Sequence, residues 1–344
     1  MIPIFLAVFF IFSFGLLNLL GIRPNLALWQ LRFFFEGLIL FLLVKKIGRQ
    51  FFFTNSKFFY WLFIFFLVVV LFLAEDVRGS RRWLNFSFIN FQPSEFFKIF
   101  FIIYLANSLA KARSLFNQRE KFFSVLGLFF LPAVLIFKQP DLGTTLVLTF
   151  IFLAMTFISN IPKKYFFRLF LIMLIFFPLS WFIMKPYQRV RLISFINPHL
   201  DSQGTAYNMI QSIITVGSGG FFGKGLGLGT QAKLLFLPEN YTDFAFASFI
   251  EQFGLFGGLI LLVLFLILFY FLVIKIYNFM HFTYPQAAVD FYYTLGFLVM
   301  IFSQVVINMG MNLGLLPVTG ITLPLISYGG SSLASFMLGL ALLP

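Results

Sequence analysis

Cysteine is absent from this 344-residue sequence, and charged residues are scarce. Without cysteine the chain can form neither a disulfide nor a thiolate metal site. Charged residues make up 10% of the chain, whereas soluble globular proteins carry about 25%. Hydrophobic residues make up 61%. A water-soluble fold could not bury that much apolar surface, so the composition predicts an integral membrane protein.

Acidic residues are scarcer than basic ones, which gives a formal net charge of +13. Such a charge can indicate nucleic-acid binding, but here the basic residues fall in short stretches between hydrophobic runs and form no single patch. We therefore expect no nucleic-acid partner and interpret the basic residues as topology signals. The 58 phenylalanines are interpreted as mostly lipid-facing.

Histidine is also rare. His199 and His281 stand far apart, and neither has a second ligand at a metal-binding spacing. The sequence therefore predicts no metal site and no required cofactor. A divalent cation that bridges a carboxylate and a phosphate group remains an option.

Apolar runs recur along the chain at about 20 residues, the length that a helix needs to cross a bilayer core about 30 Å thick. We predict an all-α polytopic membrane protein, one domain over residues 1–344, with about ten transmembrane helices. One long extracytoplasmic loop, about 185–243, is expected to carry short helices. The predicted spans are 2–21, 26–44, 58–75, 94–110, 122–137, 142–160, 165–184, 244–274, 287–309 and 325–344.

The distribution of lysine and arginine sets the orientation. If the N-terminus is cytoplasmic, the short inner loops hold more of these residues than the short outer loops. Both termini are then cytoplasmic, and the long loop faces outward. The segment from Ile2 to Leu20 has neither a basic start nor a small-residue cleavage site, so we expect a retained span.

Several ionisable residues stand near the outer ends of the predicted spans, where each needs a partner, a cavity or a function. Glu95 and Lys98 share one face of a helix and are expected to pair. Arg32 and Glu36 form a similar pair, which we interpret as structural. Asp141 opens another span. The sequence allows it to be an N-cap carboxylate or a member of a polar site.

The long outer loop ends in two features of chemical interest. Glycines surround Lys224, and such a loop can turn backbone amides and a cation towards an anion, although an ordinary flexible loop also explains the composition. Glu239 and Asp243 follow at the mouth of the eighth predicted span. Asp243 either caps that helix or, partly desolvated beside cations, serves as a general base. Ser327, in the glycine- and proline-rich segment before the last span, is interpreted as part of a cavity wall.

Four segments, in the correct order, resemble the signatures of the SEDS family, the RodA and FtsW glycosyltransferases. They are RRWLNFSFINFQPSEFFKI, QPDLGTT, YNMIQSIITVGSGGFFGKGLGLGTQAKLLFLPENYTDF and NMGMNLGLLPVTGITLPLISYGGSS. The motif GTQ-x-x-L-x-FLPE is more similar to the RodA branch, which serves elongation, than to the FtsW branch, which serves division. Tyr241, Gln252 and Thr322 depart from the family's usual His, Glu and Pro.

The resemblance implies a peptidoglycan glycosyltransferase. Such an enzyme polymerises lipid II into glycan strands at the outer face of the bacterial cytoplasmic membrane and releases undecaprenyl diphosphate. The resemblance places Asp243 on the family's essential acidic residue, here the expected general base. It implies a substrate-binding set around an outward cavity, consisting of Glu95, Lys98, Arg78, Trp83, Asp141, Arg191, Gln211, Lys224, Glu239 and Ser327. The four cations of this set are expected to stabilise the leaving diphosphate.

The resemblance also implies a partner, a single-span class B penicillin-binding protein, which is a transpeptidase. The two proteins would act together in cell-shape maintenance or in cell division. Two other interpretations stay open. A lipid II flippase would also carry intramembrane charges and broken helices, but its charges should lie near mid-membrane, and we see no internal repeat. A non-catalytic scaffold for a transpeptidase would not need Asp243.

Overall fold

The computed structural model describes residues 2–74, 82–86, 89–111, 118–183, 189, 193, 195, 197, 205–281 and 286–344. The described chain is almost entirely helical. Its helices are α1 (Ile2–Ile22), α2 (Pro24–Ile47), α3 (Arg49–Thr54), α4 (Ser56–Leu73), α5 (Pro93–Lys111), α6 (Gln118–Lys138), α7 (Leu142–Ile158), α8 (Lys163–Ile183), α10 (Thr205–Ser218), α11 (Thr230–Lys233), α12 (Ala245–His281), α13 (Ala287–Asn312) and α14 (Gly330–Ala341).

Each predicted span falls on one of these helices, and the all-helical fold class is confirmed. Six helices in the described chain, α1, α2, α4, α6, α12 and α13, are long and apolar enough to cross a membrane, while α7 and α14 are shorter apolar helices. The predicted count of ten spans is therefore not confirmed.

A short antiparallel hairpin interrupts the helical pattern before α5. Strands β1 (Leu84–Phe86) and β2 (Ile89–Phe91) pair with Leu84 opposite Phe91. Leucine, isoleucine and phenylalanine alternate with other residues through this segment, which is the pattern of a strand with one covered face. This hairpin was not predicted from the sequence.

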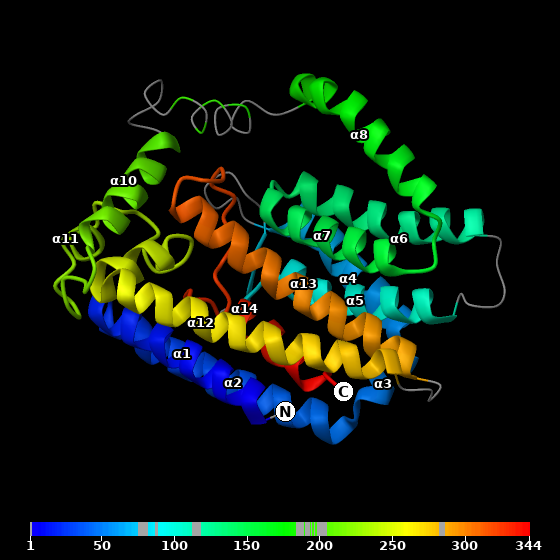
Figure 1. Cartoon of the computed structure of the whole chain (residues 1–344), viewed down its shortest axis with the longest axis horizontal. Coiled ribbons are helices and arrows are strands. Elements are labelled where there is room, and N and C mark those ends of the chain that lie inside the picture. Colours follow the sequence, from blue (N-terminus) through cyan, green and yellow to red (C-terminus); the bar gives the residue numbers. More distant parts are fainter. Residues whose placement is uncertain are drawn as a thin grey trace.

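The long helices lie side by side, with α13 at the centre of the bundle (Figure 1). Helix α13 packs against α12, α5 and α7, while α1 and α2 pack against α12 and α14, respectively. The two chain ends lie at the end of the bundle opposite α10 and α11 (Figure 1). This arrangement separates the segment that precedes α12 from both termini by the length of the bundle.

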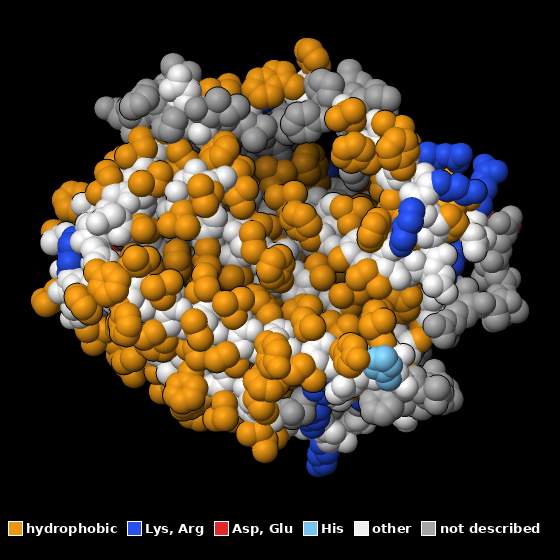
Figure 2. Space-filling view, viewed as in Figure 1, with side chains coloured by type: hydrophobic (Ala, Val, Ile, Leu, Met, Phe, Trp, Pro, Cys, Tyr) orange, Lys and Arg blue, Asp and Glu red, His pale blue; other side chains and the backbone are white. Residues whose placement is uncertain are grey.

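Hydrophobic side chains cover most of the visible surface between the two ends of the bundle, and the visible lysines and arginines lie near the helix ends (Figure 2). Some phenylalanines are exposed, such as Phe72 and Phe182, whereas others, such as Phe97, Phe101 and Phe297, are buried in the core. The interpretation of the phenylalanines as mostly lipid-facing therefore applies to only some of them.

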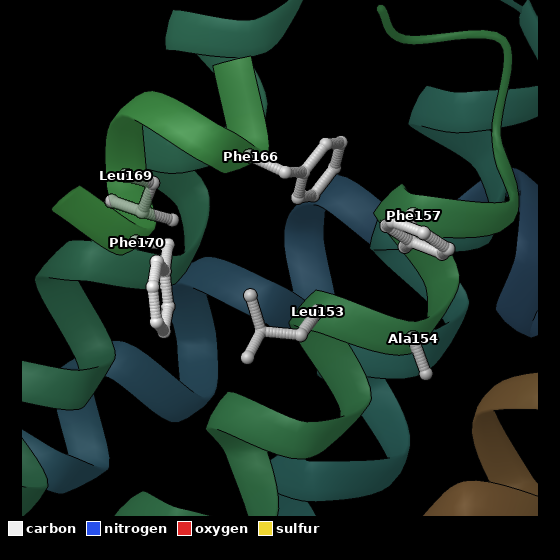
Figure 3. A pocket seen from close by; sticks show the side chains of 6 residues that line it. All are labelled: Leu153, Ala154, Phe157, Phe166, Leu169 and Phe170. Carbon is white, nitrogen blue, oxygen red and sulfur yellow. The ribbon is translucent and has the colours of Figure 1, made fainter. Parts of the chain in front are cut away.

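An apolar pocket of about 400 Å³ lies between α7 and α8. Figure 3 shows its lining side chains, which are Leu153, Ala154, Phe157, Phe166, Leu169 and Phe170. None of them can transfer a proton or bind an anion. The pocket therefore offers no chemistry of its own.

Candidate active site

The predicted site residues divide into several groups in the structure. Arg78 and Arg191 lie outside the described residues, so nothing is said of their positions. The others fall into a group around Asp243, a buried pair on α5 and a group around the glycine-rich loop. We call the first the Asp243 cluster (Arg82, Asp141, Asp243 and Gly320) and the last the Glu251 cluster (Lys224, Thr230, Gln231, Ala232 and Glu251).

Asp243 lies in a turn just before α12 and is half-buried. Its backbone carbonyl accepts hydrogen bonds from the side-chain amides of Asn308, at 2.9 Å, and Asn312, at 3.0 Å. A Cβ atom placed on Gly320 would lie 3.5 Å from Asp243 Oδ2 and 3.6 Å from Arg82 Nη1. The carboxylate and the guanidinium therefore border the same backbone position.

Arg82 connects this position to the start of α7. Its Nη1 lies 3.5 Å from Asp141 Oδ1, and its Nη2 donates to the Pro140 carbonyl. Asp141 accepts from the Thr144 backbone N–H at 3.1 Å and from the Thr144 hydroxyl at 2.9 Å. Asp141 is thus the N-cap of α7 and, in addition, an ion-pair partner in the Asp243 cluster. Trp83, next to Arg82, is half-buried.

Ser327 and Glu239 both bind the residue that precedes Asp243. The Ser327 hydroxyl donates to the Thr242 carbonyl at 2.6 Å, and Glu239 Oε2 accepts from the Thr242 hydroxyl at 2.8 Å. Both predicted residues therefore fix the turn that presents Asp243. Gln211 lies half-buried on α10, where its carbonyl accepts from Thr215.

Glu95 and Lys98 form the predicted ion pair on α5, with 2.8 Å between Lys98 Nζ and Glu95 Oε1. Both are buried, with Lys98 only 2% exposed. Ser335 on α14 lies 3.5 Å from Glu95 Oε2. The geometry is that of a satisfied internal ion pair, and a substrate contact for these two residues stays a prediction.

Lys224 is paired with Glu251 on α12, at 2.8 Å. Glu251 is completely buried. Its carboxylate also accepts from the backbone N–H groups of Gln231 and Ala232, each at 2.9 Å. The cation that was expected to face a diphosphate is therefore engaged by a carboxylate of the protein itself.

The glycine-rich loop braces a break in α12. Gly254 interrupts the helix with φ 70° and ψ −176°. The groups that lose their helical partners bond to the loop instead, through Lys224 N to Glu251 O (2.9 Å), Gly225 N to Gln252 O (3.0 Å), Leu255 N to Gly220 O (2.9 Å) and Phe256 N to Phe221 O (2.9 Å). A Cβ on Gly223 would lie 2.2 Å from the Gln252 carbonyl oxygen. The glycines permit this close approach of two backbones. At these positions the loop is an ordered brace for α12, and anion binding by Lys224 stays a prediction.

Sequence reasoning missed Arg82, Asn308, Asn312 and Glu251. The two asparagines could have been found, because they stand four residues apart in an apolar helix and so share one face. Among the residues that the structure describes, no three His, Cys, Asp or Glu side chains gather into a group that could hold a metal ion.

Comparisons with known proteins identify the family. The family model described as "Cell cycle protein", which groups FtsW, RodA and SpoVE, matches residues 1–344. The chain belongs to this family. It is 37% identical to the probable peptidoglycan glycosyltransferase FtsW of Legionella pneumophila over 318 residues, which cover 91% of this chain and 79% of that protein. It is also 37% identical to the peptidoglycan glycosyltransferase MrdB of Escherichia coli K12 over 266 residues, which cover 76% and 69%.

The fold of this FtsW/RodA/SpoVE family member matches solved structures over nearly its whole length. One is a chain of a peptidoglycan synthase complex that coordinates polymerization and crosslinking, with a TM-score of 0.83, 28% identity and coverage of 99% of this chain and 95% of that one. The crystal structure of RodA from Thermus thermophilus gives a TM-score of 0.72 at 27% identity, with coverage of 99% and 94%.

Proposed function

We propose that this chain is a peptidoglycan glycosyltransferase that polymerises lipid II, with Asp243 as its general base. The observation that carries the proposal is the Asp243 cluster, in which a half-buried carboxylate and a guanidinium border the same glycine. Family membership and the names of the relatives support the activity. A positioned general base contributes about 10²- to 10⁴-fold to the rate.

The proposed reaction joins two lipid II molecules. A sugar hydroxyl of one molecule attacks the anomeric carbon of the other, and its proton passes to the Asp243 carboxylate. The bond between that carbon and the diphosphate breaks, and undecaprenyl diphosphate leaves with the electron pair. We assign to Arg82 the stabilisation of the negative charge that grows on the leaving diphosphate, because its guanidinium borders the same glycine as the base.

This assignment changes the set of cations that the sequence suggested. Lys98 and Lys224 are each held 2.8 Å from a carboxylate of the protein. Arg82 is also paired with Asp141, but its two nitrogens reach different acceptors. A guanidinium carries five N–H donors, so these contacts leave donors for a ligand.

We propose that the Asp243 end of the bundle faces outward and that both termini are cytoplasmic. The placement of α10 and α11 at the end opposite the two termini supports this orientation (Figure 1). No cofactor is required by the proposed chemistry. A divalent cation between Asp243 and the diphosphate is an option, without a dedicated ligand group among the described residues.

The proposed partner is a class B penicillin-binding protein. The similarity to a chain from a peptidoglycan synthase complex supports this proposal. Two functions compete with this proposal: a lipid II flippase and a non-catalytic scaffold for a transpeptidase. Polymerisation in detergent separates the three, because a flippase needs two compartments and a scaffold forms no glycosidic bond.

The test is the incubation of purified protein with labelled lipid II, with and without its transpeptidase, followed by separation of the products by length. Asp243→Asn should reduce polymer formation by at least about 10²-fold, without loss of folded protein. The matched control is Glu36→Gln, since this exposed carboxylate on α2 lies outside the cluster. A product ladder that persists undiminished in Asp243→Asn, or no ladder from the native chain in either condition, would overturn the proposal.

A further inference from the structure

The side chain of Asn312 occupies an unusual position at the start of α12. Its Oδ1 accepts from the Ala247 backbone N–H at 2.9 Å, and its Nδ2 donates to the Asp243 carbonyl at 3.0 Å. Asn312 is the last residue of α13 and is completely buried. The orientation of the amide is fixed by chemistry, because one partner can only donate and the other can only accept.

These two partners are a helical pair. In an α-helix the N–H of a residue bonds to the carbonyl four residues earlier, and Ala247 stands four residues after Asp243. The carboxamide of Asn312 is thus inserted where one further helical hydrogen bond would otherwise form, the bond that would make Asp243 the N-cap of α12. Helix α12 consequently begins at Ala245, and Asp243 stays in the preceding turn.

Asn308, one turn earlier on α13, secures the same carbonyl from the other side. Its side-chain amide donates to the Asp243 carbonyl at 2.9 Å and to the Ile321 carbonyl at 2.7 Å. Ile321 follows Gly320, the residue that the Asp243 carboxylate borders. Asn308 therefore ties the backbone of Asp243 to the backbone that lies beside its carboxylate.

The insertion has a consequence for the carboxylate. Aspartate is among the residues that most favour a helix N-terminus, where it accepts from free N–H groups and interacts with the helix dipole. If Asn312 did not engage Ala247, Asp243 would be drawn to the amides of its own helix. A carboxylate bound there would turn away from Arg82 and could no longer meet a substrate hydroxyl.

We propose that Asn312 is a positioning residue, which keeps Asp243 from capping α12 and holds its carboxylate beside Gly320, the position that Arg82 also borders. The expected effect of Asn312 on catalysis rests on the proposed role of Asp243 as the base. The expected effect of Asn312 on the orientation of side chain 243 does not depend on that role. Asn308 assists by holding the same carbonyl.

The structural test uses the absence of cysteine from the chain. Asp243→Cys creates a single thiol, whose rate of labelling by a charged, water-soluble thiol reagent reports its exposure. Adding Asn312→Ala should slow the labelling several-fold, because residue 243 becomes the N-cap of α12 and its side chain turns toward the first turn of the helix. The matched control is Asn18→Ala, since Asn18 is also a completely buried asparagine that bonds to α12, at the Ala245 carbonyl, and this control should label at the original rate.

The kinetic test uses the chain with Asp243 intact. Asn312→Ala should lower kcat by about 10²-fold, the effect of misplacing a catalytic group by about 1 Å, with KM nearly unchanged. Asn312→Ser adds no buried charge and is too short to reach both Ala247 and Asp243, so it should fold even if the alanine variant does not, and should show the same loss of kcat. Asn18→Ala should keep most of the native kcat.

The outcomes separate this proposal from the proposed function. Equal labelling rates with and without Asn312, or native kcat in both Asn312 variants, would overturn the positioning role while leaving Asp243 as the base. Full activity of Asp243→Asn would overturn the base, yet slowed labelling in Asn312→Ala would still support the structural role of Asn312.

Discussion

Asp243 and Glu251 are two carboxylates that stand eight residues apart, Asp243 in the turn before α12 and Glu251 in the second turn of that helix. Glu251 is completely buried, and its oxygens accept from Lys224, Gln231 and Ala232. Asp243 is half-buried, its backbone is held by α13, and its carboxylate borders the same glycine as Arg82. The two acids therefore have opposite environments, one in the turn before α12 and one within that helix.

The contrast shows that the surrounding segments determine whether a carboxylate has a structural or a catalytic role. A carboxylate surrounded by protein donors is stabilised in its charged form and has no access to a substrate proton. The glycine-rich loop gives Glu251 that environment and thereby closes the break at Gly254. At Asp243 the side chains of α13 bind the backbone carbonyl and not the carboxylate. The turn before α12 therefore sets the orientation of the carboxylate.

The largest expected effect comes from removing Glu251. Glu251→Ala removes the carboxylate that pairs with Lys224 and that accepts from the backbone N–H groups of Gln231 and Ala232. A buried donor left without an acceptor costs about 1–3 kcal/mol in the free energy of unfolding, and this variant leaves two backbone N–H groups without theirs. We expect a clearly lower Tm in detergent, measured by thermal denaturation.

The control for this variant is Glu36→Ala. Glu36 also forms a 2.8 Å ion pair, with Arg32, but its side chain is 42% exposed. Exposed pairs contribute about 0–1 kcal/mol, so the Tm should hardly change. Equal Tm values for the two variants would show that Glu251 does not brace the break in α12, and the comparison with Asp243 would lose its basis.

Arg82 provides the second test, now on the Asp243 side. Arg82→Lys keeps the charge but cannot reach Asp141, Pro140 and a ligand at once, because an ammonium lacks the planar fork of a guanidinium. A hydrogen bond to a charged group contributes about 1.5–3 kcal/mol, so lipid II polymerisation should fall at least about tenfold. Arg32→Lys, at an exposed site, is the control. Native rates in Arg82→Lys would remove Arg82 from the site.

Much of the fold could be predicted from the sequence, since bilayer-length apolar runs are a strong signal. The pairing of Glu95 with Lys98 was also predictable, because residues three apart meet on a helix. The hairpin before α5 was not, because its short alternating pattern carries little weight beside long hydrophobic runs.

The candidate site was predictable only in part. Asp243 and Asp141 were found, but Glu251 was not, because its partner Lys224 lies 27 residues away and meets it only through the break at Gly254. In the sequence that glycine looks like any other glycine within an apolar helix. Arg82 was missed because its link to Asp243 depends on the packing of the segment around Gly320, which no local pattern encodes.

The smallest expected effect is also the most specific. Gly320 has φ +73°, and a methyl group there would lie 3.5 Å from Asp243 Oδ2 and 3.6 Å from Arg82 Nη1, which is ordinary contact. Gly48 has φ +89° and nothing within 4 Å of the same position. Replacing either glycine by alanine should cost about 1–2 kcal/mol, from the positive φ alone.

The two alanine variants should then differ in activity, although both place a side chain at a positive φ. The methyl group of Gly320→Ala stands where the substrate would approach both the base and the guanidinium, so polymerisation in the lipid II assay should fall several-fold. Gly48→Ala should lose stability and keep its rate per folded molecule. If both variants retain that rate, the space beside Gly320 is not where the sugar hydroxyl meets Asp243, and the base must be approached from another side.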